Sequence, residues 1–163
     1  MELSIVSPVY RGELMLDELV SRIHSAIKPL TTDYEIILVN DCSPDNAQEI
    51  LDSYSDPRIV RYRGEHNQGL ANVLNVGLGM ARGKYIARMD SDDVSLPDRL
   101  KVQVEYMTSH PGIDLCSCAM QLVGTREGLW RRDSDPDKVR INVDYYRNYS
   151  FLKDIKYIIQ TIV

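Results

Sequence analysis

The chain has 163 residues, a length typical of one domain with its own hydrophobic core. Its formal net charge of −5 argues against a protein that binds the phosphate backbone of nucleic acid through a basic face. No run of about 18 apolar residues predicts a transmembrane helix, and the first residues lack the basic start of a signal peptide. Three cysteines, an odd number, fit a reducing compartment. We therefore expect a globular cytoplasmic domain.

The first half of the chain alternates strand patterns with helical patterns. The strand segments are short and rich in apolar, β-branched residues, whereas the helical segments carry apolar residues at intervals of three and four. The predicted strands are 3–9, 34–39 and 58–63, and the predicted helices are 13–28, 44–54 and 70–82. Ser43 is the expected N-cap of the second helix, and Gly83 is placed to end the third.

A fourth strand, 85–89, runs directly into the acids Asp90, Asp92 and Asp93. Ser95 is then expected to cap a helix over 97–109, with Pro97 in its first turn. A fifth strand is predicted over 113–120. Strands and helices that alternate with short connections predict an α/β fold: a three-layer, mostly parallel sheet with right-handed crossovers.

In such sheets, ligands bind beyond the carboxyl ends of the strands. Tyr10, Asp41, Asn67 and the 90–93 cluster each follow a predicted strand end, so we expect them along one edge of the sheet. The first two aspartates of the cluster lie two residues apart and point to the same side of an extended chain, where they repel each other unless a cation lies between them.

Hard carboxylate oxygens suit Mg²⁺ or Mn²⁺ better than zinc. A cation held there needs a negative ligand, for which a diphosphate is the natural choice, and Asp41 can accept a hydrogen bond from the N–H of a base such as uracil. These residues predict a metal-dependent nucleotide site. The alternative for an isolated Asp-x-Asp is an acidic, solvated loop.

Three ordered motifs then resemble the family 2 glycosyltransferases of GT-A fold. They are Ser-Ile-Val-Ser-Pro-Val-Tyr at 4–10, Ile-Leu-Val-Asn-Asp-Cys-Ser-Pro-Asp at 37–45 and Gly-Lys-Tyr-Ile-Ala-Arg-Met-Asp-Ser-Asp-Asp at 83–93. The resemblance covers residues 1 to about 123. It implies a Rossmann-like, nucleotide-binding architecture, a nucleotide-diphosphate-sugar donor and inverting transfer to an acceptor hydroxyl. Enzymes of this family often serve bacterial surface polysaccharide or glycolipid synthesis.

The resemblance also assigns residues around the nucleotide base. Asp41 matches the family's base-binding aspartate, although Asn40 and Cys42 depart from the common Asp-Asp-Gly-Ser around it. The residues expected at or beside the base are Pro8, Tyr10, Glu13 and Asp41.

Asp90, Ser91 and Asp92 match the family's Asp-x-Asp motif. The resemblance makes Asp92 the more direct ligand of Mn²⁺ or Mg²⁺, while Asp90 contacts the ribose, or the metal through water. Asp93 matches a frequent following acid, to which we assign no role. Arg88 is either a contact of the diphosphate or an exposed arginine at a strand end.

The general base is not identified. In this family it usually lies in a Glu-Asp or similar motif well beyond the Asp-x-Asp, and no two acids are adjacent after residue 93. The chain therefore divides into a nucleotide-sugar-binding domain, 1–123, and a C-terminal extension, 124–163, and resembles a nucleotide-binding half with a shortened or missing acceptor half. One alternative is a truncated relative that binds a nucleotide or a partner without turnover. A phospho-acceptor domain of flavodoxin-like fold fits poorly, because no pair of acids follows the first strand.

The tail carries apolar residues at helical spacing over 151–159. This pattern predicts either a C-terminal helix docked on the sheet or a surface helix that meets a second subunit or the membrane interface. The expected partners are thus a nucleotide-diphosphate sugar, an acceptor glycan or lipid-linked sugar, and a homo-oligomer or the inner face of the membrane, but not nucleic acid.

Overall fold

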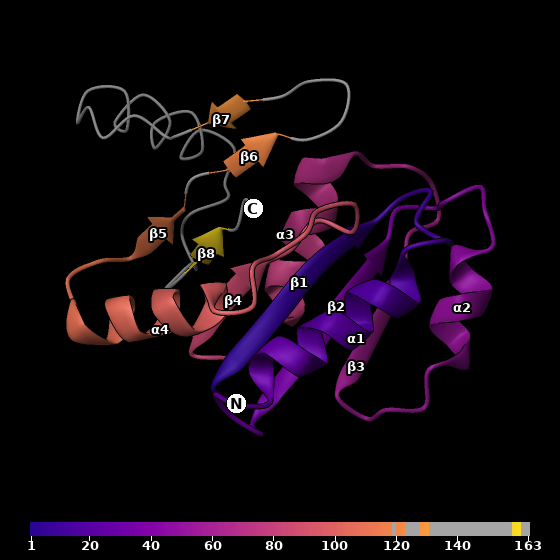
Figure 1. Ribbon diagram of the computed structural model, residues 1–163. Helices are drawn as coiled ribbons and strands as arrows, with labels where there is room; N and C mark the ends of the chain where they lie inside the picture. The colour runs from indigo at the N-terminus through magenta and orange to yellow at the C-terminus, as the bar shows by residue number, and fades with distance from the viewer. Residues whose placement is uncertain (119, 123–127, 131–157, 161–163) are drawn as a thin grey trace.

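A computed structural model gives the structure of the protein and describes residues 1–118, 120–122, 128–130 and 158–160 (Figure 1). Six strands form one sheet in the order β3-β2-β1-β4-β8-β5, and every neighbouring pair in it is parallel. The elements of this sheet and its helices are β1 (Leu3–Val9), α1 (Leu16–Ile27), β2 (Tyr34–Asn40), α2 (Ala47–Ser53), β3 (Ile59–Arg63), α3 (Leu70–Met80), β4 (Tyr85–Arg88), α4 (Arg99–Ser109), β5 (Leu115–Ser117) and β8 (Ile158–Gln160).

Helices cover both faces of the sheet, so the predicted three-layer α/β fold is confirmed. In Figure 1, α1 lies in front of the strands and α3 behind them. The larger core cluster joins β1 and β2 to α1, α2 and α4, and the smaller one joins Val6, Ile37 and Val39 to Val73 and Leu74 of α3. None of the helices in the described ranges is long and apolar enough to cross a lipid bilayer.

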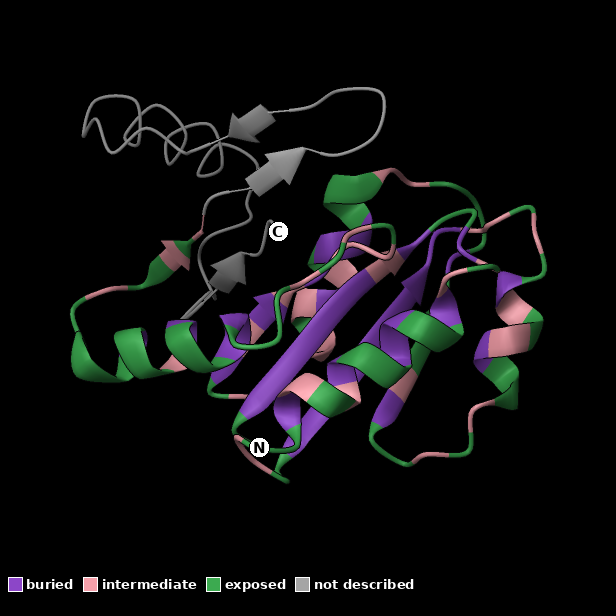
Figure 2. Ribbon diagram, viewed as in Figure 1, coloured by how far each residue is buried: buried purple, intermediate pink, exposed green. Residues whose placement is uncertain are grey.

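Strand β1 occupies the middle of the sheet. Leu3 pairs with Tyr34 of β2 on one side and with Tyr85 of β4 on the other. Six of its seven residues are buried, as expected for a parallel strand covered on both faces (Figure 2). Its two neighbours run in the same direction, so the carboxyl ends of β1, β2 and β4 meet at one edge of the sheet.

The opposite edge, at the amino ends of the strands, is held by a buried carboxylate. Glu35 is 1% exposed and accepts hydrogen bonds from Ser4 Oγ (2.7 Å) and from the backbone N–H (2.8 Å) and guanidinium of Arg82 (2.6 Å to Nη2). The N–H of Gly83 donates in turn to Ser4 Oγ (2.8 Å). These bonds fasten the segment between α3 and β4 to β1 and β2.

The predicted ends of three helices are wrong. Ser43 does not cap α2, which begins at Ala47, because its hydroxyl donates to Asp45 Oδ1 instead (2.5 Å). Ser95 does not cap α4, which begins at Arg99, because its hydroxyl accepts a hydrogen bond from Arg99 Nε (2.6 Å). Pro97 therefore precedes this helix.

The third error concerns the end of α3. Gly83 lies outside this helix, which has Ala81 as its C-cap. A Cβ atom on Gly83 would stand 2.5 Å from the backbone nitrogen of Ser4, so glycine is required here by the close approach of two backbones.

The predicted fifth strand is shorter than expected. Only 115–117 joins the large sheet as β5, whereas β6 (Met120–Leu122) pairs antiparallel with β7 (Gly128–Trp130) in a separate sheet. The helix predicted over 151–159 is wrong at Ile158 and Ile159, which belong to β8 between β4 and β5. Residues 151–157 lie outside the described residues, and the division of the chain at residue 123 stays a prediction.

Candidate functional site

The loops after β1, β2, β3 and β4 leave the carboxyl edge of the sheet. Backbone hydrogen bonds continue the strand pairing to this edge, from Asp41 N–H to the Val9 carbonyl (3.0 Å) and from Met89 N–H to the Val6 carbonyl (3.0 Å). The edge therefore carries Tyr10, Asp41 and the 90–93 cluster together, as predicted. Because β1 lies between β2 and β4, the ends of these two strands are separated by two strand spacings, roughly 10 Å.

The loops after β1 and β2 are bound to each other. The N–H of Arg11 donates to Ser43 Oγ (2.6 Å), and the N–H of Glu13 donates to Asp45 Oδ2 (3.0 Å). In return, the carboxylate of Glu13 accepts a hydrogen bond from the N–H of Asn46 (2.9 Å). Glu13, which is expected beside the nucleotide, thus also joins the two loops through hydrogen bonds that the sequence did not predict.

Asp45 is the centre of this contact between loops. Burial would raise the pKa of its carboxyl group, but hydrogen bonds from Ser43 and from the N–H groups of Glu13 and Ala47 outweigh burial and lower the pKa. Asp45 therefore remains ionised and holds the two loops in register.

Asp41 is almost fully buried, with 5% of its surface exposed. Its Oδ1 accepts a hydrogen bond from the N–H of Gln68 (2.7 Å), and its Oδ2 accepts one from the N–H of Gly69 (3.0 Å). These N–H groups belong to the turn that precedes α3, so Asp41 holds the loop after β3 against the end of β2. Each carboxylate oxygen has a further lone pair, which leaves Asp41 able to accept a hydrogen bond from a ligand.

Arg88 and Asp90 form an ion pair at the end of β4. Arg88 Nε donates to Oδ1 (2.8 Å) and Nη2 donates to Oδ2 (2.6 Å), and both side chains are about three-quarters buried. Of the two alternatives for Arg88, the simple exposed arginine is thereby excluded. Its charge is used to compensate the first aspartate of the Asp-x-Asp motif.

The remaining acids of the cluster differ from Asp90. Asp92 is exposed and has no hydrogen bond or ion pair with any described residue. Asp93 is partly buried, and burial together with the nearby charges of Asp90 and Asp92 raises the pKa of its carboxyl group. Ser91 lies against the loop after β1, because a Cβ atom on Gly12 would be 3.7 Å from Ser91 Oγ.

The cluster fits a cation that also takes ligands from a substrate. Within the described ranges, no three His, Cys, Asp or Glu side chains are grouped so that they could hold a metal alone. Mg²⁺ commonly binds through one or two carboxylates and completes its coordination with water and substrate phosphates. The unpaired carboxylate of Asp92, with Asp90 two residues away, matches that ligand set.

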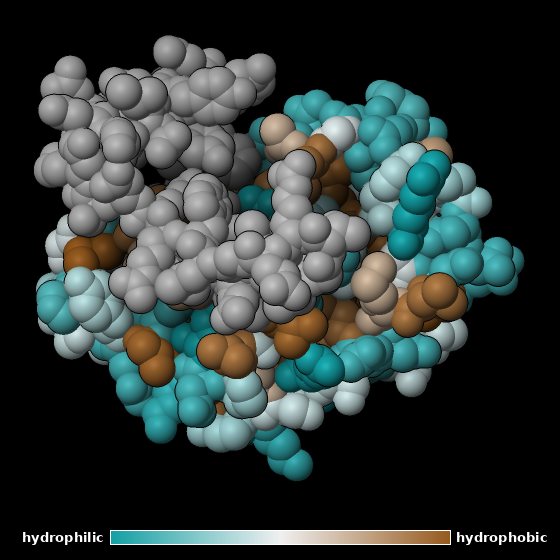
Figure 3. Space-filling view, turned by 45° about the horizontal axis from the view of Figure 1, so that its top comes forward, coloured by the Kyte–Doolittle hydropathy of each residue, from teal (hydrophilic) through white to brown (hydrophobic). Residues whose placement is uncertain are grey.

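A cavity of about 550 Å³ lies beside the cluster, between α1 and the 89–101 segment. Asp92 and Asp93 line it together with apolar residues such as Ile5, Leu19 and Met89. Arg99, also in its wall, is 8% exposed and forms no ion pair with a described carboxylate, and burial lowers its pKa to about 10. In the tilted view of Figure 3, separate hydrophobic patches are set among hydrophilic residues on the visible face.

Comparisons with known proteins agree with this arrangement. Over 135 residues the chain is 34% identical to TuaG of Bacillus subtilis, which carries the name of a teichuronic acid biosynthesis glycosyltransferase; this match covers 82% of the chain and 49% of the relative. Over 89 residues it is 37% identical to the succinoglycan biosynthesis protein ExoO of Rhizobium meliloti, covering 55% of the chain and 26% of the relative. The chain thus spans about half or less of the length of these relatives.

Solved structures show the same fold. TarS of Staphylococcus aureus (1–349), in complex with UDP-GlcNAc, superposes with a TM-score of 0.66 at 28% identity over 78% of the chain and 37% of that structure. The mannosyltransferase PcManGT of Pyrobaculum calidifontis, in complex with GDP-Man and Mn²⁺, shares the fold alone, with a TM-score of 0.61 at 19% identity over 75% of the chain and 35% of that structure. The family model for glycosyl transferase family 2 matches residues 4–161. The resemblance found in the three motifs is therefore confirmed, and the chain belongs to glycosyl transferase family 2.

Proposed function

We propose that the chain binds the donor in a glycosyltransferase that moves a sugar from a nucleotide-diphosphate sugar to an acceptor hydroxyl with inversion. The observation that carries the proposal is the convergence of Asp41 and the Asp90-Ser91-Asp92 motif on one edge of the sheet, with the loop after β1 between them. The UDP-GlcNAc complex of TarS and the polysaccharide-related names of TuaG and ExoO support a role in surface polysaccharide or glycolipid synthesis.

In this proposal the base lies at the β2 end of the edge. Asp41 accepts a hydrogen bond from a base N–H through a lone pair that Gln68 and Gly69 do not use. Pro8 and the ring of Tyr10, which is 45% exposed, border the base, and Glu13 keeps the loop after β1 in place.

The diphosphate lies at the β4 end. Asp92 would hold a divalent cation directly, and Asp90 would contact the ribose or reach the cation through water. When bound, Mg²⁺ or Mn²⁺ supplies Lewis-acid stabilisation of the negative charge that builds on the leaving diphosphate. The acceptor's proton must go to a general base, a step that contributes about 10²- to 10⁴-fold to the rate. No described residue is assigned this role. We place the reaction in the cytoplasm, at the inner face of the membrane if the acceptor is lipid-linked.

The experiment is a thermal-shift screen of the chain against UDP-, GDP- and dTDP-sugars, with and without Mn²⁺. A ligand at about 100 times its Kd stabilises a folded protein by about 2.7 kcal/mol, so a metal-dependent rise in Tm is expected with one nucleotide. Asp92→Ala should remove the metal-dependent part of the rise. Asp98→Ala removes another exposed acid, in the segment that precedes α4, and should leave the rise unchanged. If no nucleotide sugar raises the Tm of the wild-type chain, the proposal is wrong.

Transfer is tested separately, by the release of free sugar or its transfer to an acceptor. Donor hydrolysis by the wild-type chain that Asp92→Ala abolishes would establish turnover. Binding without hydrolysis or transfer would favour a nucleotide-binding relative without catalytic activity.

A further inference from the structure

The carboxyl edge of the sheet is strongly acidic for a site that is to receive a diphosphate. Its acids outnumber its bases in the loops after β1, β2 and β4. The acids are Glu13, Asp41, Asp45, Asp90, Asp92, Asp93 and Asp98, and the bases are Arg11 and, at the end of β4, Arg88. A single divalent cation compensates only part of this negative charge. A nearby positive side chain without a carboxylate partner would therefore strengthen the binding of a diphosphate at this edge.

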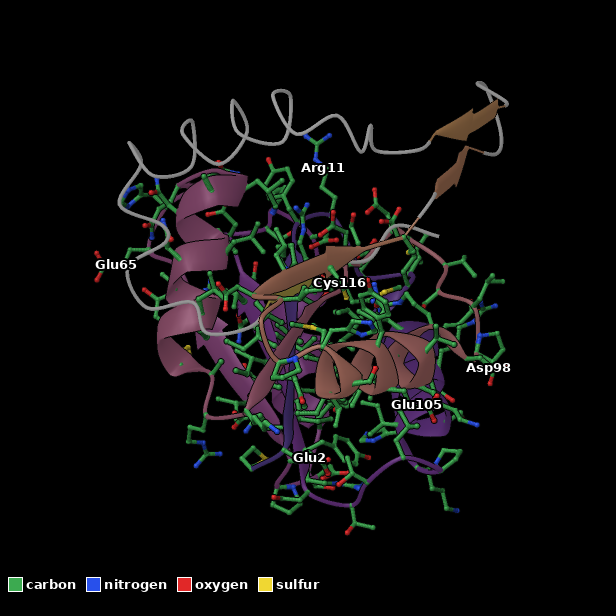
Figure 4. The ribbon with its side chains drawn as sticks, turned by 90° about the vertical axis from the view of Figure 1, so that its left-hand side faces the viewer. Glu2, Arg11, Glu65, Asp98, Glu105 and Cys116 are labelled. Atoms are coloured by element: carbon green, nitrogen blue, oxygen red, sulfur yellow. The ribbon has the colours of Figure 1, made fainter. Side chains whose placement is uncertain are left out.

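Only one of the two arginines is uncommitted. Both oxygens of Asp90 are bound by Arg88. Arg11, in contrast, is exposed and forms no ion pair with a described carboxylate, and its guanidinium carbon lies 5.6 Å from the centre of the Tyr10 ring. Figure 4 shows Arg11 projecting from the end of the sheet opposite Glu2, beyond the strand ends.

The backbone of Arg11 is held in an unusual conformation. Its φ is +56°, in the left-handed region that residues with a Cβ rarely occupy. Such conformations persist where the surrounding structure enforces them, and they are concentrated at functional sites. Here the N–H of Arg11 donates to Ser43 Oγ (2.6 Å), which fixes the direction in which the side chain leaves the loop.

The position of this loop matches the path of a nucleotide. β1 lies between β2, which carries Asp41, and β4, which carries the Asp-x-Asp motif. A donor with its base at Asp41 and its diphosphate at Asp92 must pass over the loop after β1. A Cβ atom on Gly12, which follows Arg11, would stand 3.7 Å from Ser91 Oγ, so the loop after β1 passes close to the Asp-x-Asp motif.

We infer that the Arg11 guanidinium is a further donor-binding residue, which contacts the phosphate oxygens of the nucleotide diphosphate while Tyr10 supports it. The inference rests on the proposed function. Arg11 supplies charge-assisted hydrogen bonds to the diphosphate and contributes nothing to recognition of the base.

The test compares UDP with uridine, which has the same base and ribose but no phosphate. The Kd of each for the chain is measured by NMR titration with Mg²⁺ present, since Mg²⁺ is diamagnetic. GDP with guanosine or dTDP with thymidine replaces this pair if the thermal-shift screen selects that base. Arg11→Asn removes the charge with a residue that tolerates a positive φ. We expect it to raise the Kd of UDP about tenfold and that of uridine less than about twofold. Arg11→Lys, which keeps the charge, should recover part of the loss.

Arg63→Gln is the matched control. Arg63 is exposed at the end of β3, at the same edge but on the outermost strand, and forms no ion pair with a described residue. Its removal should change the Kd of UDP less than about twofold, because β3 is the strand farthest from β4 on that side. Arg11→Gly, which fits the same backbone without strain, serves as a second charge-removing variant and must behave as Arg11→Asn does.

Two results would overturn the inference and leave the proposed function standing. One is an unchanged Kd of UDP in Arg11→Asn, and the other is an equal loss of affinity for UDP and for uridine. If the wild-type chain binds none of the three nucleoside diphosphates, the proposed function fails and the inference fails with it.

Discussion

Arg88 Nη2 lies 2.6 Å from Asp90 Oδ2, so the first acid of the Asp-x-Asp motif carries its own counter-charge from the strand that precedes it. The pair leaves Asp92 as the acid of this motif without a protein partner among the described residues. One aspartate is thereby positioned by the protein, and the other is available to a ligand.

The first prediction concerns this pair. Arg88→Gln exposes Asp90 to repulsion from Asp92 and Asp93, and should lower the free energy of unfolding by about 1 kcal/mol at low ionic strength. Urea denaturation followed by circular dichroism measures the change. Arg22→Gln is the control, because Arg22 pairs with Glu18 on the exposed face of α1 and should cost less than about 0.5 kcal/mol. Equal losses of unfolding free energy in the two variants would show that the partial burial of the Arg88–Asp90 pair does not strengthen it.

The second prediction concerns the buried carboxylate at the amino edge. Burial would raise the pKa of Glu35, but hydrogen bonds from Arg82 and Ser4 outweigh burial and lower it. A lowered folded-state pKa stabilises the fold fully above the unfolded-state pKa of about 4.3, and the gain disappears as pH falls through the folded-state value. Glu35→Gln should therefore cost about 2 kcal/mol at neutral pH.

The sign is checked by repeating the denaturation at acid pH. The difference between wild type and Glu35→Gln should shrink as the pH falls from the unfolded-state pKa through the lower folded-state pKa, because only below the folded-state value are both side chains neutral in the folded protein. Glu2→Gln alters an exposed acid at the same edge and should show no comparable pH dependence. A stability gap that stays constant from neutral to acid pH would exclude this account of Glu35.

The third prediction concerns Cys42, which has a φ of +53°. This conformation costs a residue with a Cβ about 1 kcal/mol or more, whereas glycine adopts it freely. Cys42→Gly should therefore be more stable than Cys42→Ala by about 1 kcal/mol in urea denaturation. Both variants lose the contact of the sulfur with the Glu65 carbonyl, so their difference isolates the backbone. Equal stabilities would show that this turn is not strained.

The fourth prediction compares two glycines of α3. A Cβ atom on Gly77 would collide with Val6 Cγ1 and stand 3.2 Å from Val39 Cγ2, whereas one on Gly79 would meet nothing within 4 Å. Gly77→Ala should destabilise the fold by about 1 to 3 kcal/mol through overpacking. Gly79→Ala should stabilise it by up to about 1 kcal/mol, because alanine favours a helix. Thermal denaturation of both variants measures the contrast, and a loss of stability in Gly79→Ala would refute the packing argument.

Local patterns predicted the fold well because each central strand is a nearly continuous buried run. β1 has the predicted bounds, and β2 extends only one residue further, to Asn40. The parallel direction of the strands follows from the helical crossovers, so the common edge of Asp41 and Asp90 could also be predicted, whereas the order of the strands was not.

Two of the errors, at Ser43 and Gly83, arose where a contact joins segments that are far apart in the sequence. Serine is a common N-cap residue, but the hydroxyl of Ser43 accepts a hydrogen bond from the N–H of Arg11 and donates one to Asp45. The bonds from Gln68 and Gly69 to Asp41 and the packing of Gly83 on Ser4 are likewise contacts between distant segments, which no local pattern encodes. The base-binding and metal-binding roles remain proposals.

The place of β1 between β2 and β4 also has a consequence for biosynthesis. β1 is translated well before β4, which is complete only after Arg88 has been added. Pairings between such distant segments form late, because a long loop must close first. A nucleotide bound across this edge as proposed would therefore recognise only chains in which β1 has paired with both β2 and β4.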